Sequence, residues 1–154
     1  MSAWCHGAPG VGIARVILHR LLPDDALILA EAETAIRTTE ATLGQSSPGL
    51  GNFSLCHGDG GNADFLLLAA DVLGRPQLRQ EAESVALRAI ERFEGARAPW
   101  PCGVPNAGET PNLLLGLAGI GYFLLRLFDS QKVPTILLPG KGDGECGRRI
   151  FQRA

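Results

Sequence analysis

Hydrophobic positions recur at helical spacing along most of this chain. An apolar helix is predicted behind Gly10, and the run Pro23-Asp24-Asp25 then provides a break and an N-cap for an amphipathic helix near residues 25–43. The same plan recurs as an almost wholly apolar helix from Phe65 to Leu73 and, after Gly74-Arg75-Pro76, an amphipathic helix over 77–93. The chain is therefore predicted to be all-α and built from helix pairs.

The apolar positions also predict which face of each helix is buried. In the helix near 25–43 the inward residues are expected to be Ala26, Leu29 and Ala30, with Glu31, Glu33 and Arg37 facing outward. In the helix over 77–93 they are expected to be Leu78, Val85, Ala89 and Phe93. Asp59 and Asn62 are expected to cap the helix that follows them, and Tyr122 is expected in the core. Because the first helix of each pair is more apolar than the second, two concentric layers are predicted.

Three glycine turns mark the repeats. Gly7, Gly58 and Gly116 each open a Gly-x-x-Gly turn followed by an apolar stretch, and a spacing of roughly 50 to 60 residues suits one helix pair per repeat. About three repeats are therefore present. Residues 133–138 have some strand character but contain Pro134, which favours an irregular segment or at most a short edge strand. The polar residues 140–154 are predicted to form a loose tail behind a folded unit, 1–139.

Composition narrows the function classes. With 154 residues, 45% of them hydrophobic, and a formal net charge of −2, the chain can bury one core and lacks the basic excess of a nucleic-acid-binding protein. The longest apolar run, 113–125, is shorter than the roughly 18 residues of a membrane span. No signal peptide precedes Ser2, so we expect a cytoplasmic protein whose four cysteines are thiols rather than disulfides.

The pattern Cys-His-Gly-x-x-Gly occurs twice, beginning at Cys5-His6 and at Cys56-His57. A lone cysteine is more often a small hydrophobic residue than a ligand, and a lone histidine is more often a satisfied core residue. Two Cys-His pairs at the same point of two repeats instead indicate a metal site built by the repeat. Cys102 lies in a proline-rich loop and is expected not to be a ligand, and Cys146 in the tail matches no motif.

The three motif regions resemble the lanthionine synthetase C-like cyclases, most closely the C-terminal cyclase domain of the class II lanthipeptide synthetases. They are AWCHGAPGVG (3–12), LCHGDGGN (55–62) and the segment 109–127, in the family's order, and the resemblance covers roughly residues 3–129. It implies the C-terminal part of an α/α toroid, which is a two-layer helical barrel of helix pairs. It also implies that a zinc ion, Zn²⁺, is held by Cys5, Cys56 and His57, with a fourth position open to a peptide thiol.

The resemblance further implies a reaction. A zinc-activated cysteine thiol of a dehydrated precursor peptide adds to dehydroalanine or dehydrobutyrine, which forms lanthionine or methyllanthionine. His6 is the candidate catalytic proton donor, and the alternative is a histidine that only orients the Cys5 turn. The family's other acid/base residues, a His and an Asp, lie upstream of residue 1. We therefore expect a fragment whose partners include a missing N-terminal cyclase or dehydratase portion, or alternatively an inactive relic or a zinc-dependent peptide- or thiol-binding module.

Overall fold

Helices and connecting segments account for all of the chain that the computed structural model describes, which is residues 2–45 and 51–138. The elements are a 3-10 turn η1 (Trp4–His6) and the helices α1 (Ala8–Leu21), α2 (Ala26–Gln45), α3 (Asp59–Leu73), α4 (Pro76–Phe93) and α5 (Leu117–Phe128). No strand occurs within these ranges, so the all-α prediction is confirmed, and 133–138 is irregular. The predicted tail, 140–154, lies outside the described residues.

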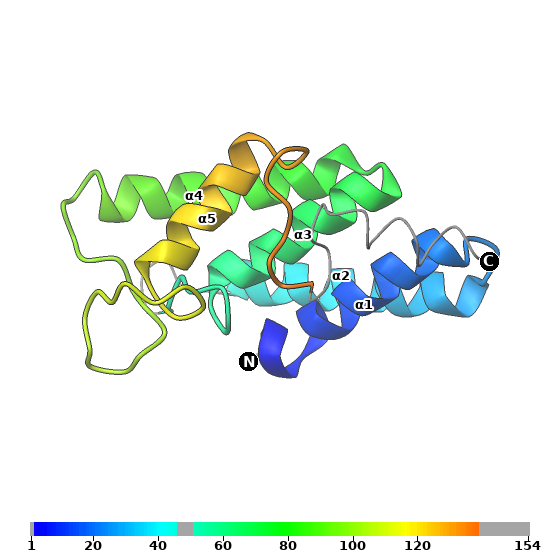
Figure 1. Ribbon diagram of the computed structural model, residues 1–154, viewed down its shortest axis with the longest axis horizontal. Coiled ribbons are helices and arrows are strands. Elements are labelled where there is room, and N and C mark those ends of the chain that lie inside the picture. Colours follow the sequence, from blue (N-terminus) through cyan, green and yellow to red (C-terminus); the bar gives the residue numbers. More distant parts are fainter. Residues whose placement is uncertain (1, 46–50, 139–154) are drawn as a thin grey trace.

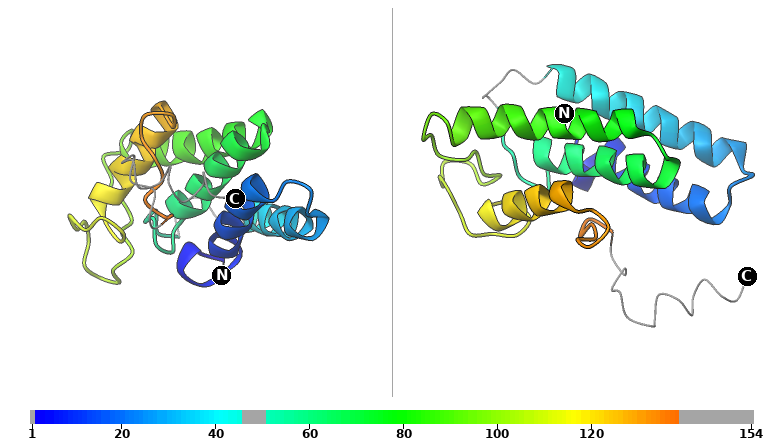
Figure 2. Two further views of the ribbon diagram at one scale, coloured as in Figure 1. Left: turned by 45° about the vertical axis from the view of Figure 1, so that its right-hand side comes forward. Right: turned by 90° about the horizontal axis from the view of Figure 1, so that it is seen from above.

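The helices form two layers (Figures 1 and 2). In the first layer α1, α3 and α5 lie in a row in chain order, and α2 and α4 pack against α1 and α3 respectively. The central helix α3 is buried at every residue from Gly60 to Ala70, because it contacts all four other helices. In α4 the predicted residues Leu78, Val85 and Ala89 are buried and Phe93 is partly buried, while the other face of the helix is exposed. The predicted two-layer arrangement of helix pairs is therefore present in α1 to α4, and α5 extends the first layer without a paired helix among the described residues.

The predicted inward face of α2 is wrong. Ala26 and Ala30 are exposed, and Leu29 is only partly buried. The buried positions are Ile28, Ala32, Ala35, Ile36, Thr39 and Leu43. Isoleucine and leucine remove more apolar area from water than alanine does, so Ile28, Ile36 and Leu43 decide how the helix is rotated against its neighbours.

The helix starts differ between α2 and α3. Oδ1 of Asp25 accepts hydrogen bonds from the backbone N–H groups of Leu27 (2.9 Å) and Ile28 (3.2 Å), so the predicted run Pro23-Asp24-Asp25 does cap α2, through Asp25. The N-cap of α3 is Gly58, which has no side-chain capping bond, so neither Asp59 nor Asn62 occupies the capping position. Carbonyl groups of the preceding loop accept the first N–H groups of α3 instead.

The second glycine of each Gly-x-x-Gly turn lies directly against a backbone carbonyl. A Cβ atom at Gly10, Gly61 or Gly119 would lie 2.1, 1.9 and 1.9 Å from the carbonyl oxygens of Trp4, Leu55 and Leu113, respectively. Those distances are far below van der Waals contact, so only glycine permits the approach. The repeated glycine therefore lets each loop pass close over the start of its helix, and the starts of α1, α3 and α5 lie towards the same end of the molecule (Figure 1).

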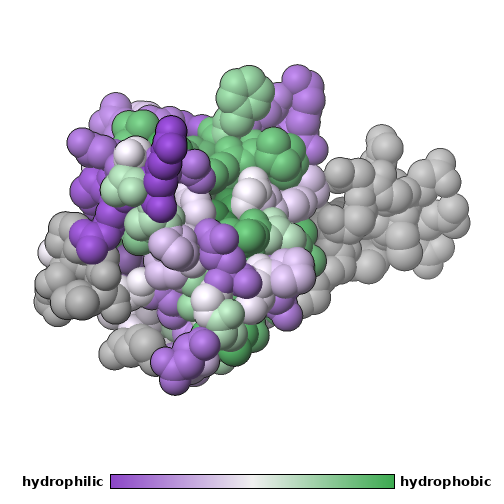
Figure 3. All heavy atoms as spheres, turned by 90° about the vertical axis from the view of Figure 1, so that its left-hand side faces the viewer, coloured by the Kyte–Doolittle hydropathy of each residue, from purple (hydrophilic) through white to green (hydrophobic). Residues whose placement is uncertain are grey.

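Large apolar residues remain exposed on and before α5. They are Leu113, Leu117, Leu125 and Phe128, and the exposed fraction of Phe128 is 91%. Apolar side chains gather in a band on the face drawn in Figure 3. In the described ranges no helix combines the length and the hydropathy that a membrane crossing requires.

Candidate metal centre

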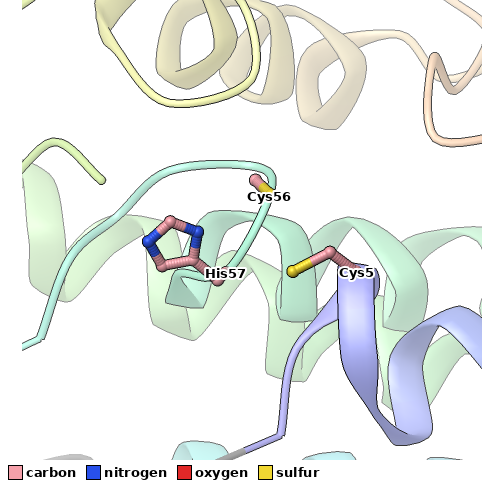
Figure 4. A group of neighbouring side chains, drawn as sticks. All are labelled: Cys5, Cys56 and His57. Carbon is pink, nitrogen blue, oxygen red and sulfur yellow. The ribbon is translucent and has the colours of Figure 1, made fainter. Parts of the chain in front are cut away.

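Two cysteines and one histidine meet at the start of α1 and α3. Cys5 lies in η1, and Cys56 and His57 lie in the turn before α3. One ligand atom of each lies within 4.8 Å of the other two, and the side chains point towards a common space (Figure 4). A tetrahedral zinc ion with bonds of about 2.3 Å to sulfur and about 2.1 Å to nitrogen needs ligand atoms about 3.6 to 3.8 Å apart. The three side chains therefore fit zinc after a small contraction and leave one position open.

Backbone hydrogen bonds join the three repeats at equivalent positions. The N–H of Cys5 donates to the carbonyl of Cys56 (3.3 Å), and the N–H of Cys56 donates to the carbonyl of Leu114 (2.9 Å). Leu114 stands in the third glycine turn where the first two have cysteine. The third repeat therefore contributes no candidate ligand at this position. Its carbonyl instead supports the turn that carries Cys56 and His57.

A backbone carbonyl orients the imidazole of His57. Nε2 lies 3.1 Å from the carbonyl oxygen of Gly103, which can only accept a hydrogen bond, so Nε2 carries the proton. The unprotonated Nδ1 then faces the two sulfur atoms (Figure 4) and is the nitrogen available to a metal. Gly103 is itself held by its N–H, which donates to the carbonyl of Leu115 (2.7 Å).

A polar side chain closes the turn that carries Cys56 and His57. Oδ1 of Asn52 accepts hydrogen bonds from the N–H (3.0 Å) and the hydroxyl (2.6 Å) of Ser54. Its Nδ2 donates to the carbonyl of His57 (3.3 Å). The turn is therefore fixed on both sides of Cys56 before any ion binds.

The charge state of the thiols depends on what occupies the site. Burial raises the pKa of the Cys56 thiol to about 11, and the hydrogen bond and charge of the neighbouring Cys5 act in the same direction. Without a cation, two thiolates this close are unfavourable. A bound metal ion reverses that balance, since it deprotonates the thiols that coordinate it, and the positive ends of α1 and α3 act in the same sense.

The remaining predicted site residues lie nearby or outside the cluster. Nδ1 of His6 is 3.0 Å from the sulfur of Cys5, and both side chains are exposed, so solvent reaches this side of the site. Cys102 does not belong to the ligand cluster that the described residues form. The roles of Asn52 and Gly103 were missed at the sequence level, because Gly103 contacts a histidine 46 residues earlier in the chain.

Comparison with known proteins agrees with the motifs and the helices. The family model described as "Lanthionine synthetase C-like protein" matches residues 1–138. The chain belongs to this family. Its all-helical, two-layer structure is that of a lanthionine synthetase C-like α/α toroid fragment.

A curated relative extends the comparison to one protein. The chain is 27% identical over 144 residues to the lacticin 481/lactococcin biosynthesis protein LcnDR2 of Lactococcus lactis subsp. lactis. The match covers 90% of this lanthionine synthetase C-like chain and 15% of that protein, so the chain spans about 15% of the relative's length. No solved structure gives a significant match.

Proposed function

We propose that this chain is the zinc-holding part of a lanthipeptide cyclase, with Cys5, Cys56 and His57 as the ligands. The convergence of two sulfur atoms and one nitrogen within 4.8 Å carries the proposal, and the family membership supports it. A Cys₂His zinc ion with an open fourth position would bind an incoming peptide thiol and favour its thiolate near neutral pH. Asn52 and Gly103 would hold the ligands in place for that task.

The proposed reaction joins a cysteine thiol of a dehydrated precursor peptide to dehydroalanine or dehydrobutyrine. A bond forms between sulfur and the β-carbon, the thiol loses its proton, and the α-carbon gains one as the double bond is lost. We assign the protonation of the α-carbon to His6, because Nδ1 of its imidazole lies 3.0 Å from the sulfur of Cys5 and an imidazole is a common general acid in proteins. The product is a lanthionine or methyllanthionine thioether.

The proposal includes two kinds of partner. One is the dehydrated precursor peptide, and the other is an N-terminal cyclase or dehydratase portion. The exposed apolar residues of α5, which include Leu125 and Phe128, are expected to contact that portion, because contiguous exposed apolar surface generally marks an interface. We place the reaction in the cytoplasm, where the free thiols of Cys5 and Cys56 stay reduced.

A second candidate is a zinc-dependent thiol- or peptide-binding module without turnover, as in a truncated relic. The exposure of His6 favours it, since the proton donor proposed for the α-carbon is open to water. Thioether formation separates the two candidates. A dehydrated peptide that also contains cysteine is incubated with the chain and the N-terminal portion of a relative in trans, and free thiols are counted by alkylation and mass spectrometry. Loss of free thiol supports the cyclase, whereas binding with no loss of thiol supports the module.

The metal is tested first. Elemental analysis of the purified chain is expected to give about one zinc ion per molecule. The Cys5→Ala, Cys56→Ala double variant is expected to contain none, and Cys102→Ala serves as the matched control that keeps its zinc. A folded, helical wild-type protein without zinc would refute the proposal.

A further inference from the structure

We propose that residues 133–138, called here the C-terminal strap, hold Cys5 in position through Trp4. The strap follows α5 and runs back across the first layer of helices towards η1 (Figure 1). The proposed effect on zinc binding rests on the proposed function, whereas the effect on the position of Cys5 does not. In this proposal Trp4, Thr135 and Leu137 are positioning residues, and none of them belongs to the candidate ligand group.

The strap is anchored at a buried ion pair. Asp64 of α3 accepts hydrogen bonds from the guanidinium of Arg126 (2.6 Å) and from the hydroxyl of Thr135 (2.7 Å). The side chains of Asp64 and Arg126 are each only 2% exposed. Burial raises the pKa of the Asp64 carboxyl, and Arg126 and Thr135 oppose that shift. Thr135 therefore satisfies a carboxylate oxygen that would otherwise be buried without a partner, which fixes the strap at this point.

Two further hydrogen bonds secure the same end of the strap. Nε of Arg126 donates to the carbonyl of Val133 (3.2 Å). The hydroxyl of Tyr122 donates to the carbonyl of Pro134 (2.8 Å), so this half-buried tyrosine joins α5 to the strap. The carbonyl groups of an irregular segment lack the backbone donors that a helix or sheet would provide. Here side chains of α5 donate the hydrogen bonds instead.

The other end of the strap reaches the turn that carries Cys5. The hydroxyl of Thr135 accepts the N–H of Leu137 (3.2 Å), and the carbonyl of Leu137 accepts the indole N–H of Trp4 (3.0 Å). The side chain of Leu137 is buried in the core, with 1% exposed. A short chain of contacts thus runs from the buried ion pair to the residue next to Cys5.

The turn that carries Cys5 is held at its start by the buried Ala3, whose carbonyl accepts the N–H of His6 (3.3 Å), and it has fewer side-chain hydrogen bonds than the turn of Cys56 and His57. It is three residues long and has no side-chain cap. The bond from the N–H of Cys5 to Cys56 is long, at 3.3 Å, and Asn62 holds only the preceding carbonyl of Ser2 (3.1 Å). In contrast, Asn52 and Gly103 fix the turn of Cys56 and His57. Loss of the strap is therefore expected to move one ligand and leave the other two in place.

Hydrogen exchange in the metal-free protein tests the positioning. In Thr135→Val, whose side chain keeps its volume and loses its hydroxyl, the indole N–H of Trp4 is expected to exchange about 3- to 10-fold faster, which is the effect of one lost hydrogen bond. The indole N–H of Trp100, which donates to Glu94 (2.7 Å), is the internal reference and stays unchanged. Thr39→Val, which also removes a buried hydroxyl, is the control and leaves both rates unchanged.

A second variant keeps the test decisive where Thr135→Val does not fold. Trp4→Phe removes the indole donor together with part of a ring that packs against the core, and the backbone N–H of Cys5 is expected to exchange faster. The proposal would be overturned if the backbone N–H of Cys5 exchanged at the wild-type rate in Trp4→Phe. It would also be overturned if the indole N–H of Trp4 exchanged at the wild-type rate in a folded Thr135→Val.

Zinc affinity tests the consequence for the metal centre. Trp4→Phe is expected to weaken zinc binding about 3- to 10-fold in competition with a chelator. In a Cys5→Ala background the same change is expected to have no further effect, because the strap acts through Cys5. An equal loss in both backgrounds would overturn the proposal. If exchange is faster in the variants but the wild-type protein binds no zinc, the positioning of Cys5 is supported and the proposed function is refuted.

Discussion

An alanine scan of two glycines in α5 would test why the Gly-x-x-Gly turn recurs. Gly119 and Gly121 lie two residues apart in the same helix, and their surroundings differ. A Cβ atom at Gly119 would lie 1.9 Å from the carbonyl oxygen of Leu113 and 3.2 Å from a methyl group of Leu55, whereas a Cβ at Gly121 meets nothing within 4 Å. The two substitutions therefore change helix propensity alike and differ in packing.

The expected free energies of unfolding follow from those distances. Gly121→Ala should stabilise the protein by about 0.5 to 1 kcal/mol, which is the helix propensity difference between the two residues. Gly119→Ala needs a shift of more than about 1 Å to reach van der Waals contact, and such overpacking costs about 1 to 3 kcal/mol. The shift also weakens the bond from the N–H of Leu117 to Thr110 (2.8 Å), which costs about 1 kcal/mol more. The two variants should therefore differ by about 3 kcal/mol.

Urea unfolding followed by circular dichroism measures both free energies. The slope of free energy against urea concentration should be the same in both variants, since each keeps the same fold. Equal stabilisation of the two variants would refute the close-approach explanation of the repeated glycine. Equal destabilisation would show that alanine disturbs α5 for a reason unrelated to Leu113.

Three further predictions concern the metal centre, the core and the pH dependence. Gly103→Ala places a Cβ 2.8 Å from Oγ of Ser54 and 3.0 Å from Cε1 of His57, which is expected to displace the imidazole and to weaken zinc binding about 10-fold in chelator competition, and an unchanged affinity would contradict the close packing of His57 against Gly103. Arg126→Met leaves Asp64 buried without its cation and should cost about 3 to 5 kcal/mol in urea unfolding, so a cost below about 1 kcal/mol would count against the pair. The hydrogen bond from Arg75 lowers the pKa of Glu33, so its stabilisation is present above the ordinary carboxyl pKa and is lost as the pH falls through the lowered one. Wild type should therefore lose up to about 1 kcal/mol more than Glu33→Gln between about pH 5 and about pH 3 in urea unfolding, and parallel pH curves would contradict this.

The helices and the repeat could be predicted because their causes are local. Spacing of apolar residues predicted α1, α4 and the part of α3 from Phe65 to Leu73, and the polar run Pro23-Asp24-Asp25 was predicted to provide the cap of α2, which is Asp25. The face of α2 was predicted wrongly, because several rotations of an alanine-rich helix look equally apolar in sequence. Contacts with other helices selected the rotation that buries Ile28 and Ile36.

The capping role expected for Asn62 failed for a related reason. Its position near a helix start is typical of a cap, and its amide nevertheless donates to the carbonyl of Ser2, 60 residues earlier. A carbonyl at that distance in sequence gives no local signal. The same holds for the contact of His57 with Gly103, which decides the nitrogen that faces the sulfur atoms.

The sequence by itself determined the helix-pair repeat, the glycine turns and the kinds of side chain at the candidate metal centre, since these depend on spacing and residue type. The repeat also predicted that Cys5 and Cys56 meet, and packing of α1 against α3 brings these equivalent turns together. Only the tertiary structure decided that the imidazole of His57 meets the carbonyl of Gly103. It also decided that the indole of Trp4 meets the carbonyl of Leu137, 133 residues later. Such contacts form where folded helices bring distant backbone groups within hydrogen-bonding distance, and no pattern of neighbouring residues encodes them.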